Sequence, residues 1–286
     1  MTSPPGNAEQ VQRWNGESGQ QWIANRERHQ AAHRRLIPHL FAAAAIAPGD
    51  QVLDVGCGCG ETTITAAAAA SGGSALGLDL SAPMLEVARQ LAAQAGVANA
   101  RFLQGDAQVQ PLRRGFHDVV ISKFGVMFFG DPAAAFANIA AGVRTGGRLA
   151  FLCWQDDDHN EMFGIPMNAF RECARLPGPP REGLFEDPRR VTELLTGAGW
   201  TDVGTEAINE PAWLGTDVAD VLRYVRRIRM VENLIAGLAD DALAERALAS
   251  AAEQYAARLR PDGVWIDAGV WLVTARRGPR SSPMSQ

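Results

Sequence analysis

Short apolar runs alternate with helix-like segments through the middle of the chain. The runs of strand length are residues 51–55, 75–79, 101–106, 118–121 and 148–154. Between them the apolar positions recur with helical spacing, and helix signals such as Ser81 and Asp131 stand where an N-cap is expected. Strands that alternate with helices at this spacing predict an α/β fold with a parallel, doubly wound sheet.

The alternation of strand-like and helix-like segments stops at both ends of this region. Residues 8–47 have a helical pattern in which Trp14 and Trp22, eight positions apart, share nearly one helical face. After residue 154 the chain becomes rich in acidic residues, Met, Phe and Pro, and a long helical stretch later separates two strand-like segments. The division that follows is a helical cap (1–50), a sheet core (51–154, 187–214, 263–277) and two insertions that form a lid (155–186, 215–262).

Three features fall at the carboxyl ends of successive predicted strands, where open α/β sheets bind ligands. Gly56, Gly58 and Gly60 form a tight turn after the first strand, and Asp79 ends the second, where it can accept hydrogen bonds from ribose hydroxyls. Asp106 and the next residue, Ala107, follow the third strand, where a carboxylate and a backbone N–H can read the edge of adenine. The three features together indicate an adenosine site.

A dinucleotide site is the alternative interpretation of the glycine turn. Its fingerprint needs a third glycine at position 61, where this chain has Glu61. A negative charge at a helix start opposes a pyrophosphate. The pattern therefore favours an adenosine ligand without phosphate.

Composition limits the class of partner. The 286-residue chain has 27 basic and 32 acidic residues, a net charge of −5, which argues against a general affinity for nucleic acid or anionic membranes. Its longest alanine runs are far shorter than the roughly 20 apolar residues of a membrane span, and residues 1–6 are not an apolar signal region. We therefore expect a cytoplasmic protein.

The four cysteines are not spaced in the regular way that is typical of a disulfide framework. We therefore expect reduced thiols and no metal site.

The motifs VLDVGCGCG (52–60), GLDLSAPML (77–85), GDA (105–107) and SKFGVMFFGDP (122–132) resemble those of the class I S-adenosylmethionine-dependent methyltransferases. The resemblance is close over residues 50–155 and extends more loosely to bacterial small-molecule enzymes of the UbiE-like type. It implies a Rossmann-like seven-stranded sheet whose last strand is antiparallel. It also implies S-adenosylmethionine as cofactor and S-adenosylhomocysteine as product.

The resemblance also implies roles for individual residues. Asp54 and Gly56 would contact the methionine end of the cofactor, above a turn that Gly58 shapes. The other cofactor contacts would be the ribose carboxylate, the residues around adenine, a backbone carbonyl and two tryptophans on a covering helix: Asp79, Leu80, Met84, Asp106, Ala107, Ser122, Trp14 and Trp22. Lys123, Phe124, Met127 and Trp154 would line the substrate site.

The reaction class requires little from the protein beyond geometry, because the sulfonium supplies its own leaving group. If the acceptor is a hydroxyl, a general base would help, and the candidates are His29, His33 and His159. The acceptor atom, O, N or C, stays open. Aromatic residues near the predicted pocket suggest a small, partly apolar acceptor, with secondary metabolism as a natural context.

Two other functions stay open. An RNA methyltransferase could use arginine clusters at positions 26–35 and 223–229, although the acidic balance argues against it. A protein that binds the cofactor without methyl transfer is the second.

The acidic run 156–161 could hold a divalent cation, but consecutive residues cannot all point inward, so we expect a solvated loop. The chain could be a monomer or a homodimer.

Overall fold

The computed structural model describes residues 7–175, 183–238 and 240–279. A central sheet has the strand order β3-β2-β1-β4-β5-β8-β6, and β7 pairs with β8. The strands are β1 (Gln51–Val55), β2 (Ser74–Asp79), β3 (Ala100–Gln104), β4 (His117–Lys123), β5 (Val143–Trp154), β6 (Trp200–Gly215), β7 (Leu259–Arg260) and β8 (Gly263–Arg277).

The pairing confirms the predicted sheet. β1 to β5 are parallel to one another, and the last strand, β8, is antiparallel to both β5 and β6. The prediction of seven strands missed β7, a two-residue strand that pairs with Gly263 and Val264. So short a strand has no periodicity in the sequence by which it could be recognised.

Helices cover both faces of the sheet. The helices are α1 (Ala8–Asn15), α2 (Glu17–Ala24), α3 (Arg26–His33), α4 (Ile37–Ala44), α5 (Glu61–Ala69), α6 (Ala82–Gln94), α7 (Pro132–Gly142), α8 (Glu161–Ala174), α9 (Pro188–Gly197), α10 (Val218–Val225), α11 (Arg229–Ala236) and α12 (Asp241–Ala256), with short 3-10 helices at Gly125–Phe128 and Asp157–His159. α4 and α5 pack on one face, and α7 and α9 on the other. Because both faces are covered, the central strands are apolar on both sides.

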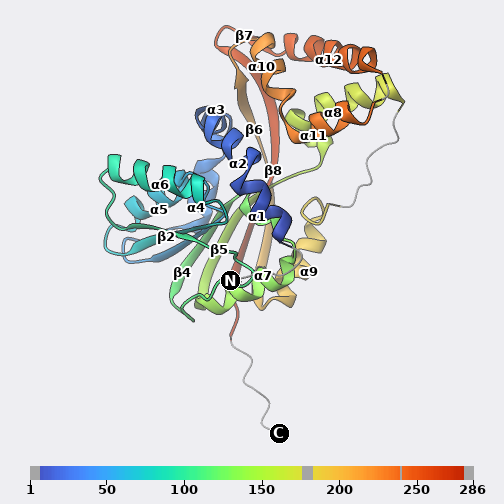
Figure 1. Ribbon diagram of the computed structural model, residues 1–286. Helices are drawn as coiled ribbons and strands as arrows, with labels where there is room; N and C mark the ends of the chain where they lie inside the picture. The colour runs from blue at the N-terminus through green and yellow to red at the C-terminus, as the bar shows by residue number, and fades with distance from the viewer. Residues whose placement is uncertain (1–6, 176–182, 239, 280–286) are drawn as a thin grey trace.

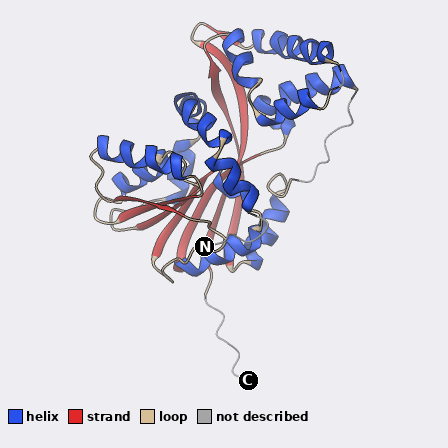
Figure 2. Ribbon diagram, viewed as in Figure 1, coloured by secondary structure: helices blue, strands red, loops and turns tan. Residues whose placement is uncertain are grey.

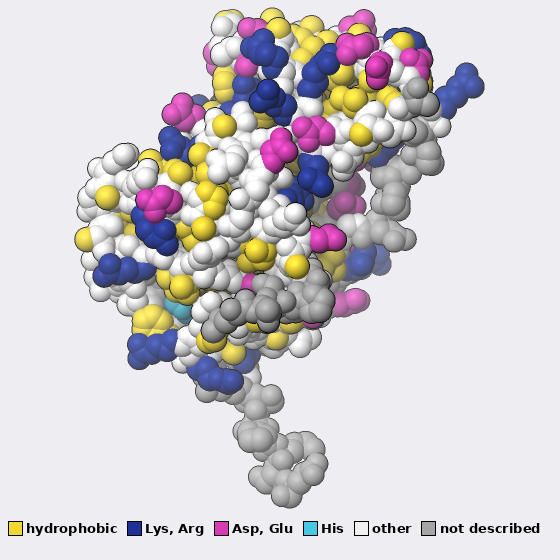
Figure 3. Space-filling view, viewed as in Figure 1, with side chains coloured by type: hydrophobic (Ala, Val, Ile, Leu, Met, Phe, Trp, Pro, Cys, Tyr) yellow, Lys and Arg dark blue, Asp and Glu magenta, His cyan; other side chains and the backbone are white. Residues whose placement is uncertain are grey.

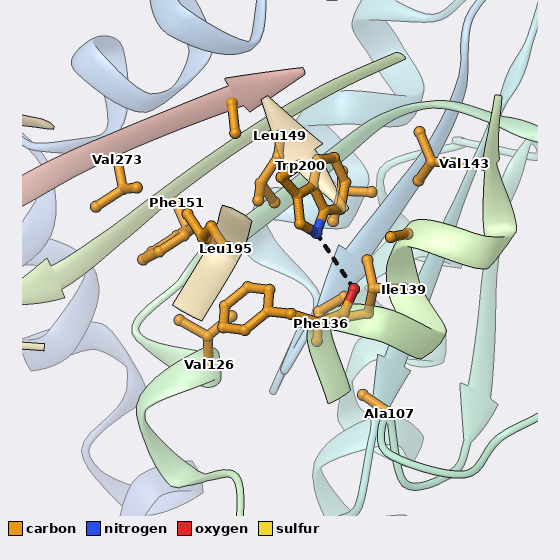
Figure 4. Packing of buried hydrophobic residues seen from close by; sticks show 14 of the residues in the cluster. Ala107, Val126, Phe136, Ile139, Val143, Leu149, Phe151, Leu195, Trp200 and Val273 are labelled. Atoms are coloured by element: carbon orange, nitrogen blue, oxygen red, sulfur yellow. Dashed lines mark hydrogen bonds between the residues drawn. The ribbon is translucent and has the colours of Figure 1, made fainter. Parts of the chain in front are cut away.

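The core under α7 and α9 shows how the sheet is held (Figure 4). Phe136 and Ile139 of α7 and Leu195 of α9 are fully buried against Phe151 of β5. The indole of Trp200, at the start of β6, lies in the same cluster and donates from Nε1 to the carbonyl oxygen of Phe136 at 3.2 Å. This bond satisfies the one polar atom of a fully buried indole, so the large apolar ring is accommodated without an unpaired donor.

The N-terminal cap is a series of short helices, not one long one. α1 ends at Asn15, and Gly16 separates it from α2, so Trp14 and Trp22 lie on two helices. A Cβ on Gly19 would lie 2.0 Å from the carbonyl oxygen of Trp14, so the second helix folds tightly against the end of the first. The expectation that one helix carries both tryptophans was wrong, because their eight-residue spacing also fits two helices that meet at a glycine.

β6 and β8 extend beyond the rest of the sheet as a long two-stranded arm (Figure 2). The arm carries a group of helices, α8, α10, α11 and α12, which we name the helical unit (Figure 1). The helical unit has its own apolar core, which includes Phe170, Val225, Leu248 and Tyr255. α1 to α3 lie between the sheet and the helical unit (Figure 1).

The predicted segments can be located in this architecture. The cap (1–50) contains α1 to α4, and the lid insertion 215–262 contains α10 to α12. The other insertion, 155–186, contains α8, while its residues 176–182 lie outside the described part of the chain. Of the helices in the described residues, none is both long and apolar enough to cross a membrane.

Candidate active site

A cavity, which we name the strand-end cavity, opens at the carboxyl ends of β1, β2, β3 and β4. Its empty space is about 980 Å³, including the part open to solvent, which is ample for a nucleoside. Nine of the eleven predicted cofactor residues line it: Trp14, Trp22, Gly56, Gly58, Asp79, Leu80, Met84, Asp106 and Ala107. Residues from four successive strand ends and from the N-terminal cap therefore meet around one space.

The glycine turn after β1 is shaped by close backbone approach. Gly56 has φ +69°, and a Cβ there would lie 2.5 Å from the Cα of Gly125 in the turn after β4. Gly60 plays a different part, since a Cβ on it would lie 2.7 Å from the Cβ of Ala88 in α6. One glycine therefore lets two ligand-facing turns meet, and the other lets a helix pack closely.

Asp79 ends β2 inside the strand-end cavity. Its Oδ2 accepts from the Gly58 N–H at 2.7 Å and its Oδ1 from the Ser81 N–H at 2.9 Å. Burial raises the pKa of this carboxyl above its ordinary value. Each carboxylate oxygen has two lone pairs, so both can still accept a hydrogen bond from a ligand hydroxyl.

Asp106 follows β3, and Gln108 holds both of its carboxylate oxygens. Its Oδ1 accepts from the Gln108 N–H at 3.0 Å and its Oδ2 from the Gln108 side-chain amide at 3.3 Å. Asp106 and Ala107 both line the strand-end cavity and are nearly buried. A carboxylate fixed in this way has little freedom to lose when it binds a ligand.

Asp54 does not line the strand-end cavity, although the sequence analysis placed it at the methionine end of the cofactor. The carboxylate is fully buried, and its Oδ2 accepts from the hydroxyls of Thr62 at 2.7 Å and Thr63 at 2.6 Å, in the first turn of α5. Burial raises its pKa to about 6, against the lowering effect of the two threonine donors. Its contacts with the first turn of α5 fix the start of that helix beside the glycine turn.

Ser122 and Lys123 end β4 beside the glycine turn. Ser122 is fully buried and does not line the cavity, and its hydroxyl donates to the Val55 carbonyl at 2.7 Å. Lys123, the only lysine of the chain, lines the cavity, where its Nζ lies 2.5 Å from a carboxylate oxygen of Glu61. The charge of the lysine is therefore balanced within the protein, which leaves it less able to pair with a substrate anion.

The two tryptophans form part of the cover of the cavity. Trp14 lies edge-on to Trp22, with ring centroids 6.1 Å apart, and edge-on to Phe128 at 5.1 Å. The carbonyl oxygen of Trp14 accepts from the Ser81 hydroxyl at 2.7 Å. Since Ser81 is the N-cap of α6, directly after β2, this bond fixes the cap to the strand end that carries Asp79.

Sequence reasoning missed three polar residues of the cap that line the same cavity, Asn7, Arg26 and Gln30. Asn7 Oδ1 and Arg26 Nε are buried and have no hydrogen-bond partner in the described part of the chain. Buried polar atoms without partners are costly in a folded protein. A polar ligand in the cavity would relieve that cost. No local sequence pattern marks Asn7 and Gln30, and Arg26 stood out only as one of a cluster of arginines; the folding of α1 and α3 onto the strand ends brings the three together.

A second cavity, which we name the aromatic cavity, adjoins the first. Trp14, Trp22, His29, Phe124 and Phe128 line both cavities. Its remaining lining comes from the cap, from the end of β5 and from the helical unit: Arg13, Ser18, Gln21, Asn25, His33, Trp154, Met162, Phe163, Tyr224, Arg227, Ile228 and Arg229. The two cavities thus lie side by side and share these five lining residues, with the sheet on one side and the helical unit on the other.

Of the predicted substrate-site residues, Phe124 and Trp154 meet at the join. Their rings stack with centroids 4.0 Å apart and an interplanar angle of 9°. Phe124 has φ +65°, an uncommon conformation for a residue with a side chain. Met127 lines neither cavity; it packs into the core, where its sulfur accepts from the Trp154 N–H at 3.4 Å.

Two of the three candidate bases lie in this site. Burial, followed by the charges of Lys123 and Arg28, lowers the pKa of His29 to about 3, and burial lowers the pKa of His33 well below its ordinary value. His29 Nε2 lies 3.0 Å from the Tyr224 hydroxyl, and the Nδ1 atoms of His29 and His33 have no partner in the described residues. His159 is outside the site, exposed, with Nδ1 2.6 Å from Asp156.

The acidic run and the cysteines have other surroundings. Asp157 pairs with Arg171, and Glu161 pairs with Arg258. Cys57 and Cys59 are buried in the glycine turn, and burial raises the pKa of both thiols, that of Cys59 to about 11. In the described ranges no cluster of three or more His, Cys, Asp or Glu is arranged to hold a metal ion.

A parallel sheet with a glycine turn after β1 and carboxylates after β2 and β3 defines a nucleoside-binding α/β protein. A family model described as "Methyltransferase domain" matches residues 52–147. The trans-aconitate 2-methyltransferase of Deinococcus radiodurans is 32% identical over 186 residues, which are 61% of this chain and 68% of that protein. The chain belongs to the class I S-adenosylmethionine-dependent methyltransferases.

Two further similarities concern the sequence and the fold. An uncharacterized protein of Mycobacterium tuberculosis is 37% identical over 170 residues, 59% of this chain and 60% of that one. The crystal structure of YcgJ from Bacillus subtilis has a TM-score of 0.59 at 18% identity, covering 87% of this chain and all of that chain, which supports the fold. The chain spans about 60% of the length of the mycobacterial relatives that it matches.

Proposed function

We propose that this protein transfers a methyl group from S-adenosylmethionine to a small, partly apolar acceptor. The observation that carries the proposal is the strand-end cavity, which Asp79 and Asp106 line and which shares five lining residues with the aromatic cavity. The unpartnered atoms of Asn7 and Arg26 in the same cavity support a ligand with a polar end.

The residues of the strand-end cavity suit each part of the cofactor. Asp79 would accept from the ribose hydroxyls, Asp106 and Ala107 would bind the adenine edge, and Leu80 and Met84 would flank the ring. Arg26, with Asn7 and Gln30, would receive the charged amino-acid end, which is a role that the sequence did not suggest. S-adenosylmethionine, when bound, supplies an electrophilic methyl group on a sulfonium whose leaving group is a neutral thioether.

The chain's own contribution to the reaction is to position the acceptor and exclude water. The stacked rings of Phe124 and Trp154 and the indole of Trp22 surround the join between the two cavities. Holding the acceptor in line with the methyl group converts an encounter into an intramolecular step. Where the acceptor atom carries a proton, the neutral imidazoles of His29 and His33 are the groups placed to accept a hydrogen bond from it.

The surroundings of the arginines support a small acceptor over RNA. Arg26 lies in the strand-end cavity, Arg28 pairs with Asp220, and Arg35 lies over the ring of Trp265 at 5.5 Å. Basic and acidic side chains are interspersed on the face that Figure 3 shows. Strong RNA binding requires a continuous basic surface, and the net charge of −5 works against one.

Calorimetric titration with S-adenosylhomocysteine, with NADH as a control ligand, tests the proposal. We expect binding of the first alone. Asp79→Asn should cost about 2 kcal/mol, or a roughly thirtyfold weaker Kd, because an amide cannot accept from both ribose hydroxyls. The matched control is Asp202→Asn, at an exposed position outside both cavities where φ is +51°, a conformation that Asn tolerates. Equal affinity in the two variants would refute the ribose assignment.

A further inference from the structure

The aromatic cavity has an apolar part and a cationic part. Its apolar part is built from flat rings: Trp154 stacks on Phe124 and meets Phe163 edge-on, with centroids 5.7 Å apart. Trp22 lies over the imidazole of His29, with centroids 4.0 Å apart. Ring faces on several sides favour a flat apolar molecule over a branched one.

The cationic part consists of Arg13 from α1, Arg227 from the turn after α10 and Arg229 at the start of α11. None of the three forms an ion pair with any acidic side chain of the described residues. Arg13 lies over the rings of Trp14 and Phe128, and its Nε is buried without a hydrogen-bond partner. These guanidinium groups therefore have capacity for an anion.

Neighbouring arginines that do not line the cavity behave differently. Arg226 pairs with Glu245 at 2.9 Å, and Arg223 pairs with Asp220 at 3.4 Å. The paired arginines, 223 and 226, directly precede the unpaired ones, 227 and 229, in one short segment, so composition alone does not explain which ones are paired. The unpaired charges are the ones that face the cavity.

Two further observations indicate that an anion would be stabilised there. Burial and the nearby charge of Arg229 lower the pKa of Arg13, so the two cations are close enough to oppose each other. α11 begins at Arg229, and its N-cap, Ile228, has no side chain that can accept from the first-turn N–H groups. Like charges and an uncapped helix start are both relieved by a bound anion.

Resting on the proposed function, we propose that the methyl acceptor is an organic acid with a flat, apolar body. The body lies against the stacked pair of Phe124 and Trp154 on its open side, and the acidic group binds to Arg13, Arg227 and Arg229. Lys123 does not provide this recognition, because it is paired with Glu61. The acidic group orients the acceptor, and a charge at one end fixes which of its atoms faces the methyl group.

The test uses binding, so it does not depend on knowing the natural acceptor. The full-length protein, saturated with S-adenosylhomocysteine, is titrated by calorimetry with 2-naphthoate, with 2-naphthyl phosphate and with the neutral 2-naphthamide. We expect at least one of the two acids to bind tenfold or more tightly than the amide. The two acids distinguish a carboxylate from a phosphate ester as the recognised group.

Matched variants locate the effect. Arg227→Gln/Arg229→Gln should weaken binding of the preferred acid at least tenfold and leave the amide unchanged. Arg223→Gln/Arg226→Gln, which removes as many charges from the same segment outside the cavity, should leave the acid unchanged. All four altered arginines have exposed side chains, and Arg13, which is not exposed, is left unchanged, so we expect folding to be preserved.

The outcomes separate the two proposals. If S-adenosylhomocysteine does not bind, the proposed function fails. If it binds but neither acid is preferred over the amide, or if both double variants weaken the acid equally, the organic-acid acceptor is refuted while the proposed function stands.

Discussion

The strand-end cavity and the aromatic cavity are built from the chain in different ways. Most of the first comes from turns within residues 55–129, each directly after a strand of one parallel sheet. The second collects residues from α1 to α3, the ends of β4 and β5, α8 and the α10–α11 segment. A parallel sheet brings its strand ends together by its hydrogen-bonding register alone, whereas the aromatic cavity forms only when the helical unit packs against the cap.

The difference has a functional meaning under the proposed function. A cofactor shared by a whole family suits a site made by the sheet, whose geometry follows from the fold. An acceptor that varies suits a site made by added helices, which can change without disturbing the sheet core. Three changes, taken from the largest expected effect to the smallest, test how the sheet builds the first site and whether the second can be altered without it.

The largest effect should follow from Gly56→Ala in the strand-end cavity. A Cβ there meets the Gly125 backbone at 2.5 Å, and φ is +69°. We expect the free energy of unfolding to fall by roughly 3 kcal/mol or more, from strain plus overpacking, with loss of S-adenosylhomocysteine binding. Urea denaturation and calorimetry measure the two effects.

Gly96→Ala provides the control, since Gly96 has φ +68° and nothing within 4 Å of an added Cβ. Its cost should be about 1–2 kcal/mol, the conformational strain alone. Equal losses in the two variants would mean that the close approach of the turns after β1 and β4 contributes nothing.

The second effect concerns the pH dependence of stability through Asp54. Its pKa is about 6 in the folded protein and near 3.8 when unfolded, so the folded state binds more protons between these values. Stability is therefore lost as pH rises from about 4 to about 6, by on the order of 2–3 kcal/mol. In Asp54→Asn this part of the pH dependence should disappear.

Urea denaturation of wild type and variant at pH 4, 5, 6 and 7 measures the difference. Asp202→Asn is the control, because an exposed carboxylate should give a difference from wild type that does not change with pH. If the wild-type and Asp54→Asn curves are parallel over this range, the carboxylate is not held in the buried state described above.

The sequence predicted the sheet and its strand-end residues because both depend on local patterns. The glycine turn, Asp79 and Asp106 each follow directly from an apolar run, and nine of the eleven predicted residues lie at the strand-end cavity. Asp54 and Ser122 do not: Asp54 is fully buried with its Oδ2 held by Thr62 and Thr63, and Ser122, predicted to contribute its backbone carbonyl, is fully buried behind the cavity wall. Which partner a buried polar group finds is not encoded by its position relative to a strand.

The aromatic cavity was much harder to predict. His29, His33 and Trp154 were named for chemical type, but Arg13 and Tyr224 lie at positions where no motif exists. Arg227 and Arg229 belong to a cluster that from the sequence resembles a solvated face. Only the folded helical unit separates the arginines that are paired outside the cavity from those that line it.

The smallest effect should follow from Arg28→Met, which tests most directly whether the two sites are independent. Arg28 of α3 donates to both carboxylate oxygens of Asp220, at 2.8 and 2.9 Å, and to the carbonyl oxygen of Leu214, so it joins the cap to the helical unit. Both charged side chains are mostly buried, at 16% and 17% exposed, and we expect a loss of about 2 kcal/mol. Hydrogen exchange should quicken in α10 and α11, while S-adenosylhomocysteine affinity stays as in wild type.

Arg226→Met is the matched control, because its pair with Glu245 is exposed and lies within the helical unit, and such pairs contribute about 0–1 kcal/mol. Binding of the naphthyl acids should weaken in Arg28→Met and not in Arg226→Met, since only the first loosens the wall that carries Arg227 and Arg229. If Arg28→Met weakened S-adenosylhomocysteine instead, the cofactor site would depend on the helical unit. The sheet alone would then not be enough to build it, and the division between a site made by the fold and a site made by its additions would be wrong.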